Sequence, residues 1–252
     1  MLKVMTFNLR TDSEIDGINR FFMRSERVLE AIRNENPDLI GFQEATGPMR
    51  EFLYKNLSDY TVLGCGSNAQ LQREGNPIAF KTGKFELIGF ETAWLSDTPD
   101  VPGSNFGGDQ SKYPRYYHLA RLHVLGDVDA TVVYINTHTD HLGQQAREKA
   151  SRVLLDVLEK EKRNPLILSG DFNALPDSAE MQLLLSHENL GLSDATVDLP
   201  GTFHNYGRRN HTFKCDYIFS TLSCHESHIV EDIPVNGVYI SDHNPVVATL
   251  EI

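Results

Sequence analysis

The sequence predicts a protein of the α/β or α+β class, in which helices cover mixed β-sheets. Short apolar segments typical of strands recur along all 252 residues, and amphipathic segments typical of helices stand between some of them. Neither a repeat, a low-complexity tract nor a linker-like break interrupts this alternation, so layered sheets and helices are favoured. Hydrophobic residues make up 40% of the chain, and a chain of this length buries a sizeable core. We therefore expect a single domain over residues 1–252.

The chain begins with a strand, because Leu2–Leu9 has the alternating pattern of one. A helix follows, and it should end before Pro37, since the residue preceding a proline disfavours the helical conformation. Leu39–Gln43 is then a short buried strand and Pro48–Leu57 a short helix. The stripe that the first helix is expected to turn toward the core consists of Ile18, Phe22, Ser25, Leu29 and Ile32.

The remainder of the chain supplies two more helices and most of the strands. The clearest helix is Gln144–Lys162, whose apolar residues recur at steps of three and four, as in a helix that covers a sheet. Pro165–Gly170 is a buried strand that leads directly into Asp171, and Ser178–Leu185 is a short helix. Further strands are expected at Thr61–Cys65, Asn76–Phe80, Phe85–Trp94, Tyr116–Leu125, Asp129–Asn136, Cys215–Ser220, His225–Ile229 and Val246–Ile252.

The chain is acidic, and this restricts its partners. It has 35 Asp and Glu residues against 23 Lys and Arg residues, a net charge of −12 with neutral histidines. Such a surface repels phosphate backbones and anionic membranes at long range, so we expect no stable track for duplex DNA. A local phosphate site is still compatible with this charge, because a bound divalent cation can dominate the field inside a carboxylate-lined cleft.

The cysteines and the N-terminal segment favour a cytoplasmic protein. Cys65, Cys215 and Cys224 are odd in number and form no C-x-x-C pair, so no zinc motif is indicated. The chain enters a strand pattern at once, without the apolar segment of a signal peptide, and no apolar run is long enough to span a bilayer. We expect a monomer without a membrane partner, and we expect Cys215 to pack in the core.

Acidic, amide and histidine residues fall where the buried strands begin or end. Such groups can meet at one rim of a sheet, where α/β proteins usually place their sites. Carboxylate oxygens together with neutral amides suit Mg²⁺ or Mn²⁺ and not zinc. These residues are Asn8, Glu44, His138, Asp171, Asn173, Asp216, Asp242 and His243.

Six short motifs contain these residues, and together they resemble the ordered motif set of the endonuclease/exonuclease/phosphatase superfamily. A single motif would be weak support, but six in the family's order are strong. The motifs are Phe7-Asn8, Gln43-Glu44, Asn136-Thr137-His138, Gly170-Asp171-Phe172-Asn173, Asp216-Tyr217-Ile218-Phe219 and Ser241-Asp242-His243-Asn244-Pro245.

The resemblance implies a four-layer α/β sandwich, with two mixed β-sheets packed face to face and flanked by helices. It also implies divalent-metal-dependent hydrolysis of a phosphoester bond, with Mg²⁺ or Mn²⁺ as the cofactor. Carried over by motif, Glu44 is the main metal ligand, Asn8 assists it, and Asp242 binds the metal directly or through water. Asp171 would orient and deprotonate the attacking water, and Asn173 would hold a phosphate oxygen.

The same resemblance assigns the two motif histidines to the phosphate. His243 would contact it while oriented by Asp216, and His138 matches the second phosphate-contacting histidine. A histidine beside a carboxylate favours the imidazolium form, which donates both of its N–H groups. Taken singly, each of these residues has a structural alternative; a lone histidine such as His138 is more often a hydrogen-bonded core residue.

Three further residues are expected to bind the substrate. Arg115 follows the long loop Ser96–Pro114 and resembles an arginine of some bacterial family members, so a phosphate contact is favoured over a surface ion pair. Asp140 and His141 continue the His138 motif and could line the pocket, although Asp140 could equally cap the helix that follows. We also expect Gly201–His204 to form a wall of the pocket.

The predicted function is metal-assisted, in-line attack of water on a phosphoester, as in a phosphodiesterase, nuclease or phosphatase. The scarcity of positive charge favours a compact phosphorylated substrate: a sugar phosphate, a nucleotide, a short oligonucleotide or a lipid headgroup. The alternative is a catalytically inactive module that recognises phosphate, but every matched acidic and histidine position is intact. A secreted phospholipase would need an export signal and a membrane-inserting apolar loop, and the sequence shows neither.

Overall fold

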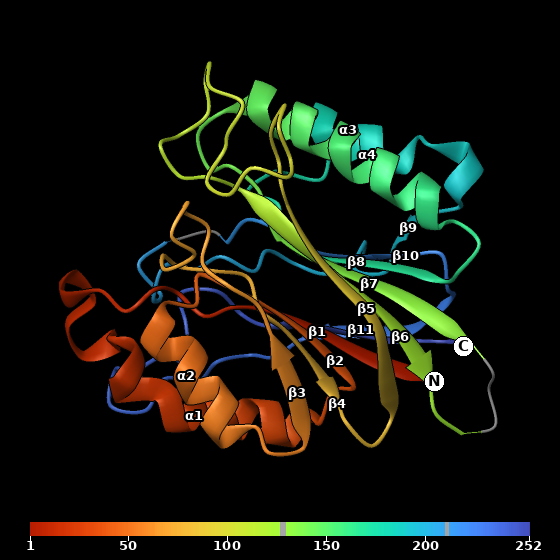
Figure 1. Ribbon diagram of the computed structural model, residues 1–252. Coiled ribbons are helices and arrows are strands. Elements are labelled where there is room, and N and C mark those ends of the chain that lie inside the picture. The colour runs from red at the N-terminus through yellow and green to blue at the C-terminus, as the bar shows by residue number, and fades with distance from the viewer. Residues whose placement is uncertain (127–129, 210–211) are drawn as a thin grey trace.

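The computed structural model describes residues 1–126, 130–209 and 212–252, and over these ranges the chain forms four layers (Figure 1). Two mixed six-stranded sheets pack face to face, α1 and α2 cover the outer face of one, and α3 and α4 cover the outer face of the other. The predicted four-layer sandwich is confirmed. The predicted strand Asp129–Asn136 begins at Asp129, which lies outside the described residues.

The first sheet has the strand order β11-β12-β1-β2-β4-β3. β1 lies at its centre, parallel to β2 and antiparallel to β12. The chain therefore brings its first and last strands together in one sheet. The strands are β1 (Leu2–Asn8), β2 (Leu39–Gln43), β3 (Tyr60–Leu63), β4 (Ile78–Lys81), β11 (Cys224–Ile229) and β12 (Val246–Leu250).

The second sheet has the order β5-β6-β7-β8-β10-β9. Here β7 and β8 form the parallel pair, and the remaining neighbours are antiparallel. The parallel pairs of the two sheets face each other, since β1 and β2 pack against β7 and β8. The strands are β5 (Phe85–Trp94), β6 (Tyr116–Val124), β7 (Thr131–His138), β8 (Leu166–Asp171), β9 (Ser193–Asp194) and β10 (Asp216–Ser220).

In the described residues, three apolar cores lie between the four layers. One core lies between the first sheet and its helices, one lies between the sheets, and one lies between the second sheet and its helices, where Leu154 and Leu158 of α3 are fully buried. Within the described ranges, none of these helices is long and apolar enough to cross a bilayer. The helices are α1 (Phe21–Glu35), α2 (Gly47–Asn56), α3 (Gln144–Glu161) and α4 (Ala179–Leu185), with short 3₁₀ segments η1 (Glu14–Asn19) and η2 (Glu188–Leu190).

The buried face of α1 differs from the predicted stripe. Ile18 lies before the helix in η1, and Ile18 and Phe22 are 55% and 49% exposed, so the prediction that they face the core is wrong. Gly17 has a positive φ of 56° that interrupts the helical run. α1 then starts at Phe21, whose backbone N–H donates to the Asp12 carboxylate (2.9 Å). This start rotates the helix so that Phe21, not Phe22, enters the core.

Two buried motif amides join the sheets directly below the strand ends. Gln43 Nε2 donates to Asn136 Oδ1 (2.8 Å), and Asn136 Nδ2 donates to the carbonyl oxygen of Phe42 (2.8 Å). A Cβ atom at Gly41 would lie 2.3 Å from Asn136 Oδ1, so only glycine allows this approach. Because buried amides cost free energy unless bonded, this link fixes the register between the sheets.

The loop Ser96–Pro114, before β6, is anchored to the start of α3. The Asp109 carboxylate accepts hydrogen bonds from the backbone N–H groups of Gln145 (2.8 Å) and Ala146 (3.1 Å). These N–H groups have no partner within the helix, and a carboxylate there also complements the helix dipole. The loop is therefore held in place, and only its last residues are free to reach a site.

Candidate active site

The predicted site residues surround one cavity of about 360 Å³, at the rim where the parallel strands of both sheets end. Asn8 and Asp216 lie directly behind its wall, and Asp140 does not line it. All the other predicted catalytic, metal-binding and substrate-binding residues do. The lining consists of Arg10, Thr11, Glu44, Glu74, Tyr113, Arg115, His138, His141, Asp171, Asn173, Phe203, Asp242 and His243.

Asn8 ties a carboxylate of one sheet to a carboxylate of the other. It is the last residue of β1 and is 1% exposed. Its Nδ2 donates to Asp171 Oδ2 (2.9 Å) and to Glu44 Oε1 (3.2 Å), and its Oδ1 accepts from the Arg10 backbone N–H (2.9 Å). One amide therefore sets the spacing of two carboxylates that come from different sheets.

The carboxylates of Glu44 and Asp242 both lie near the guanidinium of Arg10. Glu44 follows β2 with a positive φ of 61°, an uncommon conformation outside glycine that turns its side chain out of the strand. Its Oε2 accepts from the Thr11 backbone N–H (3.0 Å). The Arg10 guanidinium lies 3.9 Å from Glu44 Oε2 and 3.8 Å from Asp242 Oδ2. Two carboxylates that converge on one positive charge, with only oxygen donors, are a suitable set for Mg²⁺ or Mn²⁺.

Asp171 is a buried carboxyl group whose pKa is raised to near neutral pH. Burial raises its pKa, the negative charge of Asp216 raises it further, and the result is about 7 although His243 opposes the shift. Its Oδ1 accepts from the Asn173 backbone N–H (2.9 Å). A group with this pKa changes protonation state near neutral pH, as a general base requires.

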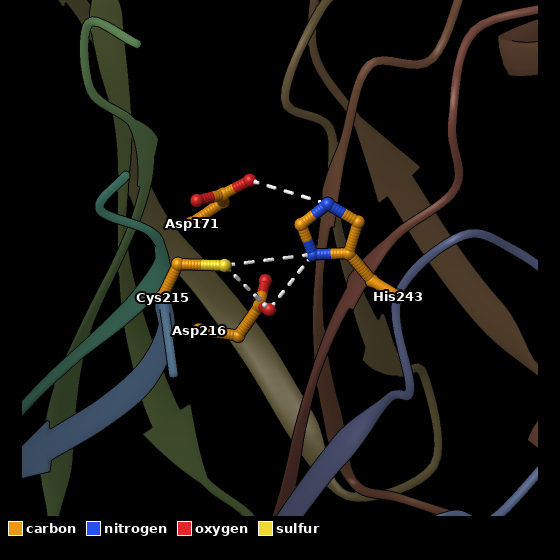
Figure 2. A group of neighbouring side chains, drawn as sticks. All are labelled: Asp171, Cys215, Asp216 and His243. Carbon is orange, nitrogen blue, oxygen red and sulfur yellow. Dashed lines mark hydrogen bonds and ion pairs between the residues drawn. The ribbon is translucent and has the colours of Figure 1, made fainter. Parts of the chain in front are cut away.

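His243 lies between two carboxylates, Asp216 and Asp171 (Figure 2). Its Nδ1 donates to Asp216 Oδ2 (2.9 Å), and its Nε2 lies 3.9 Å from Asp171 Oδ2. Burial lowers the pKa of His243, but Asp216, Asp171 and Asp242 together raise it to about 10. The ring is therefore an imidazolium at neutral pH, with its Nε2–H directed toward the cavity. Thr202 donates to the same Asp216 oxygen (2.5 Å) and supports the pair.

Cys215 belongs to this network without being a reactive thiol. It is fully buried, 3.4 Å from Asp216 Oδ2, and burial raises its pKa. The ligand atoms of Cys215, Asp171, Asp216 and His243 lie within 4.8 Å of one another, a spacing that a metal ion could use. However, His243 Nδ1 carries a proton that it donates to Asp216, so this cluster is better described as a hydrogen-bond network.

His138 and Asn173 form a neutral pair on the cavity wall. Asn173, which also has a positive φ (48°), donates from Nδ2 to His138 Nε2 (2.9 Å) and to the carbonyl oxygen of Thr139 (3.1 Å). Burial, reinforced by Arg115, lowers the pKa of His138 well below its usual value. His138 therefore accepts this hydrogen bond as a neutral imidazole, in contrast to His243.

Arg115 is held by Asp140 and His141, shortly after the His138 motif. Its Nη2 donates to His141 Nδ1 (2.9 Å), and its Nε lies 3.5 Å from Asp140 Oδ2. Asp140 also accepts hydrogen bonds from the backbone N–H groups of Leu142 (3.0 Å) and Gly143 (2.8 Å), just before α3. Asp140 thus supports the arginine and the turn into the helix, whereas Arg115 and His141 line the cavity.

Some residues that line the cavity could not be found by the motif pattern. Glu74 and Tyr113 lie in loops with no periodic signal, and Arg10 and Thr11 follow the first motif directly, where adjacency to Asn8 is the one available signal. The predicted wall before β10 is represented by Phe203, whose ring lies 4.8 Å from that of His243.

A fully buried arginine was also missed, and it positions two of the motifs. Arg24 of α1 is 0% exposed. Its guanidinium donates to the backbone carbonyl oxygens of Leu9 (2.6 Å) and Arg10 (2.8 Å), and to that of Ile240. One side chain therefore connects the segment after Asn8 to the segment before Asp242. Five N–H donors in a rigid fork make arginine suited to this task.

Comparison with known proteins agrees with this arrangement. The profile of the Endonuclease/Exonuclease/phosphatase family matches residues 5–243. An endonuclease/exonuclease/phosphatase from Bacteroides vulgatus superimposes with a TM-score of 0.91 at 27% identity, covering 100% of this chain and 98% of that one. A mannosyl-6-phosphatase from Bacteroides thetaiotaomicron gives 0.90 at 24% identity, covering 100% of both chains. An uncharacterised protein of Acanthamoeba polyphaga mimivirus is 24% identical over 99% of this chain and 100% of its own length.

Proposed function

Because the chain belongs to the endonuclease/exonuclease/phosphatase family of phosphoester hydrolases, we propose that it is a divalent-metal-dependent hydrolase of a compact phosphoester. The observation that carries the proposal is the convergence of Glu44, Asp242 and Asp171 with the His243 imidazolium on one cavity. A volume of about 360 Å³ is at the lower end for small-molecule sites, which favours a compact substrate.

Glu44 and Asp242 would hold the metal ion, with Asn8 fixing the position of Glu44 through its amide. When bound, the metal would offset the negative charge of the phosphate and the charge that develops on its oxygens. Arg10 already lies beside both carboxylates and provides a second positive group at this end of the cavity. The carboxylates are therefore arranged before any substrate enters.

Asp171 would take the proton of the attacking water. The water oxygen forms its bond to phosphorus while the bond to the leaving oxygen breaks, and that oxygen takes up a proton from solvent. His243 donates its Nε2–H to a phosphate oxygen, and Asp216 keeps the ring charged and oriented. His138 at the end of β7 and Asn173 just after β8 would complete the phosphate site. No covalent intermediate is needed.

A cytoplasmic location and a compact substrate remain part of the proposal. The three cysteines are free, which suits a reducing compartment. A protein of net charge −12 repels a long polyanion and neutralises few of its phosphates. Each phosphate that Lys or Arg does neutralise contributes about 0.9 to the salt slope on duplex DNA, so we expect that slope to be shallow. We therefore propose that the substrate engages the site through one phosphate.

The function is tested by hydrolysis of aryl phosphates, hexose phosphates, a short single strand and a duplex, each with Mg²⁺ or Mn²⁺ and with EDTA. Turnover of a compact ester that EDTA abolishes and added metal restores is the expected result, together with duplex binding of shallow salt dependence. Full activity in EDTA would remove the metal from the mechanism. Phosphate binding without turnover of any substrate would support the inactive binding module, and a steep salt slope with efficient duplex cleavage would indicate an endonuclease.

The pH profile of an Asp216→Asn variant tests the assigned protonation states. In the wild type, kcat/KM should rise as Asp171 ionises near pH 7 and fall as His243 loses its proton near pH 10. Removing the negative charge of Asp216 lowers both pKa values, so both limbs should move to lower pH, by about one to three units for the alkaline limb. Glu14→Gln, at a side chain 90% exposed, is the control for net charge. An alkaline limb that stays in place would show that Asp216 does not hold the His243 proton.

A further inference from the structure

One wall of the cavity is built from groups that the proposed hydrolysis does not use. Glu74 comes from the loop between β3 and β4, Tyr113 from the loop before β6, and His141 from the turn after β7, and all three line the cavity beside Arg115. The same region continues into a side cavity of about 10 Å³ that shares Glu74, Tyr113 and Arg115. This space has room for about one water molecule. Polar side chains therefore surround both the cavity wall and the side cavity behind it.

The loop that presents Glu74 is fixed to the metal-binding strand. Gly75 pairs with Ala45, the residue after Glu44, through two backbone hydrogen bonds of 2.9 and 2.8 Å. A Cβ atom at Gly75 would lie 2.0 Å from the Cys65 carbonyl oxygen, so the close approach requires glycine. The backbone beside Glu74 is therefore fixed to the residue that follows Glu44, as a preorganised binding group requires.

Arg50 secures this loop a second time. Its Nη1 donates to the carbonyl oxygens of Ala45 (2.7 Å) and Arg73 (2.9 Å), the latter directly before Glu74. Among the described residues, the Glu74 carboxylate forms no ion pair within 4.0 Å, and burial together with the negative charge of Glu44 raises its pKa. Glu74 thus presents acceptor oxygens that the protein itself leaves largely unused.

The neighbouring groups are donors. His141 accepts from Arg115 through Nδ1, so its ring proton is on Nε2, and its lowered pKa keeps it neutral. Arg115 has donors only. A hydroxyl group both donates and accepts, so adjacent hydroxyls can donate to Glu74 and accept from Arg115 or His141. An apolar group in the same place would leave these polar groups desolvated and unpaired, which is costly.

We infer that Glu74, Tyr113, Arg115 and His141 form the leaving-group subsite, and that it selects a hydroxyl-rich leaving group such as a sugar. This inference rests on the proposed function and narrows its substrate class to sugar or polyol phosphates. The ring of Tyr113 borders this subsite, 5.9 Å from the ring of His141, and its hydroxyl group adds a further polar group for a leaving group of this kind.

The test compares hexose 6-phosphates with cyclohexylmethyl phosphate, which has the same ring size and the same primary alkyl ester without ring hydroxyls. The best of glucose, mannose and galactose 6-phosphate should exceed cyclohexylmethyl phosphate in kcat/KM by at least about 100-fold, as expected where a site hydrogen-bonds substrate hydroxyls. Glu74→Ala should reduce this ratio at least about tenfold, mainly through KM of the sugar phosphate. Glu74→Gln, which keeps the shape and one acceptor, should fall between the two.

Gln72→Ala, an exposed change on the same loop, is the matched control and should keep the wild-type ratio. Thermal unfolding of each variant shows whether the loop is intact. A ratio that Glu74→Ala leaves unchanged overturns the inference, as does an equal loss on both substrates. If p-nitrophenyl phosphate and cyclohexylmethyl phosphate are hydrolysed with metal but no hexose phosphate is, the subsite assignment fails while the proposed function stands. If all of them are inert, both fail.

Discussion

Asp171→Asn is expected to lower kcat by about 10²–10⁴-fold, the usual contribution of a general base. The amide keeps the shape of the carboxyl group but cannot accept the proton of the attacking water. Metal affinity, measured by calorimetry, should remain within a few-fold, because Glu44 and Asp242 are unchanged. Asp177→Asn, an exposed carboxylate just beyond the same strand, is the matched control.

The same variant should not lose stability, and this distinguishes loss of the base from misfolding. The folded-state pKa of Asp171 is raised to about 7, above the ordinary value of an unfolded chain. The folded state therefore binds the proton more tightly, and this carboxyl group reduces the free energy of unfolding as pH rises from about 4 to 7. Asparagine removes that cost but leaves one of the two donors to Asp171, the Asn8 amide or the Asn173 backbone N–H, without an acceptor, so Tm at pH 8 should stay close to the wild-type value. Unchanged kcat would exclude Asp171 as the base.

Glu44→Gln is expected to weaken Mg²⁺ or Mn²⁺ binding by at least about 100-fold, since even indirect supports of a metal site typically contribute 10–100-fold. Turnover should be nearly abolished at low metal concentration and partly restored at high concentration. Calorimetric titration with the metal alone provides the measurement that does not depend on catalysis.

Glu51→Gln, on the exposed side of α2, provides the comparison for a lost surface carboxylate. The Glu44 carboxylate accepts from Asn8 Nδ2 and from the Thr11 backbone N–H, so the isosteric amide keeps one of these two bonds, and the fold should tolerate the loss of the other. Wild-type metal affinity in Glu44→Gln would show that the cation binds elsewhere in the cavity.

Much of the fold was predictable because its strands are apolar runs bounded by polar residues. Leu39–Gln43 and Phe85–Trp94 are found at the predicted bounds, and the polar residue that ends each buried strand had to lie at a rim. The predicted site residues came together because parallel strands end at the same edge. Asn8 and Glu44 were thus recognisable from their positions at the ends of buried strands, and not from local propensity.

Other features depended on contacts that no local pattern encodes. The face of α1 was set by a cap from Asp12 and by the conformation of Gly17, so periodicity alone selected Phe22 in place of Phe21. Glu74 reaches the site because Gly75 pairs with Ala45 across 30 residues of chain, as the numbering shows. The two-residue strand β9 is too short to give a sequence signal.

The antiparallel pairing of β1 with β12, residue 2 opposite residue 250, also determines when this protein can first become active during its synthesis. At about 5–20 residues per second, a ribosome makes the two strands roughly ten to fifty seconds apart. Throughout that interval one edge of β1 has no neighbour, and an open edge of this kind can recruit other nascent chains. Residues 242 and 243 also leave the ribosome only shortly before β12. The chain must therefore be synthesised through β12 before the site can assemble, and the half-built sheet needs protection until that strand is released.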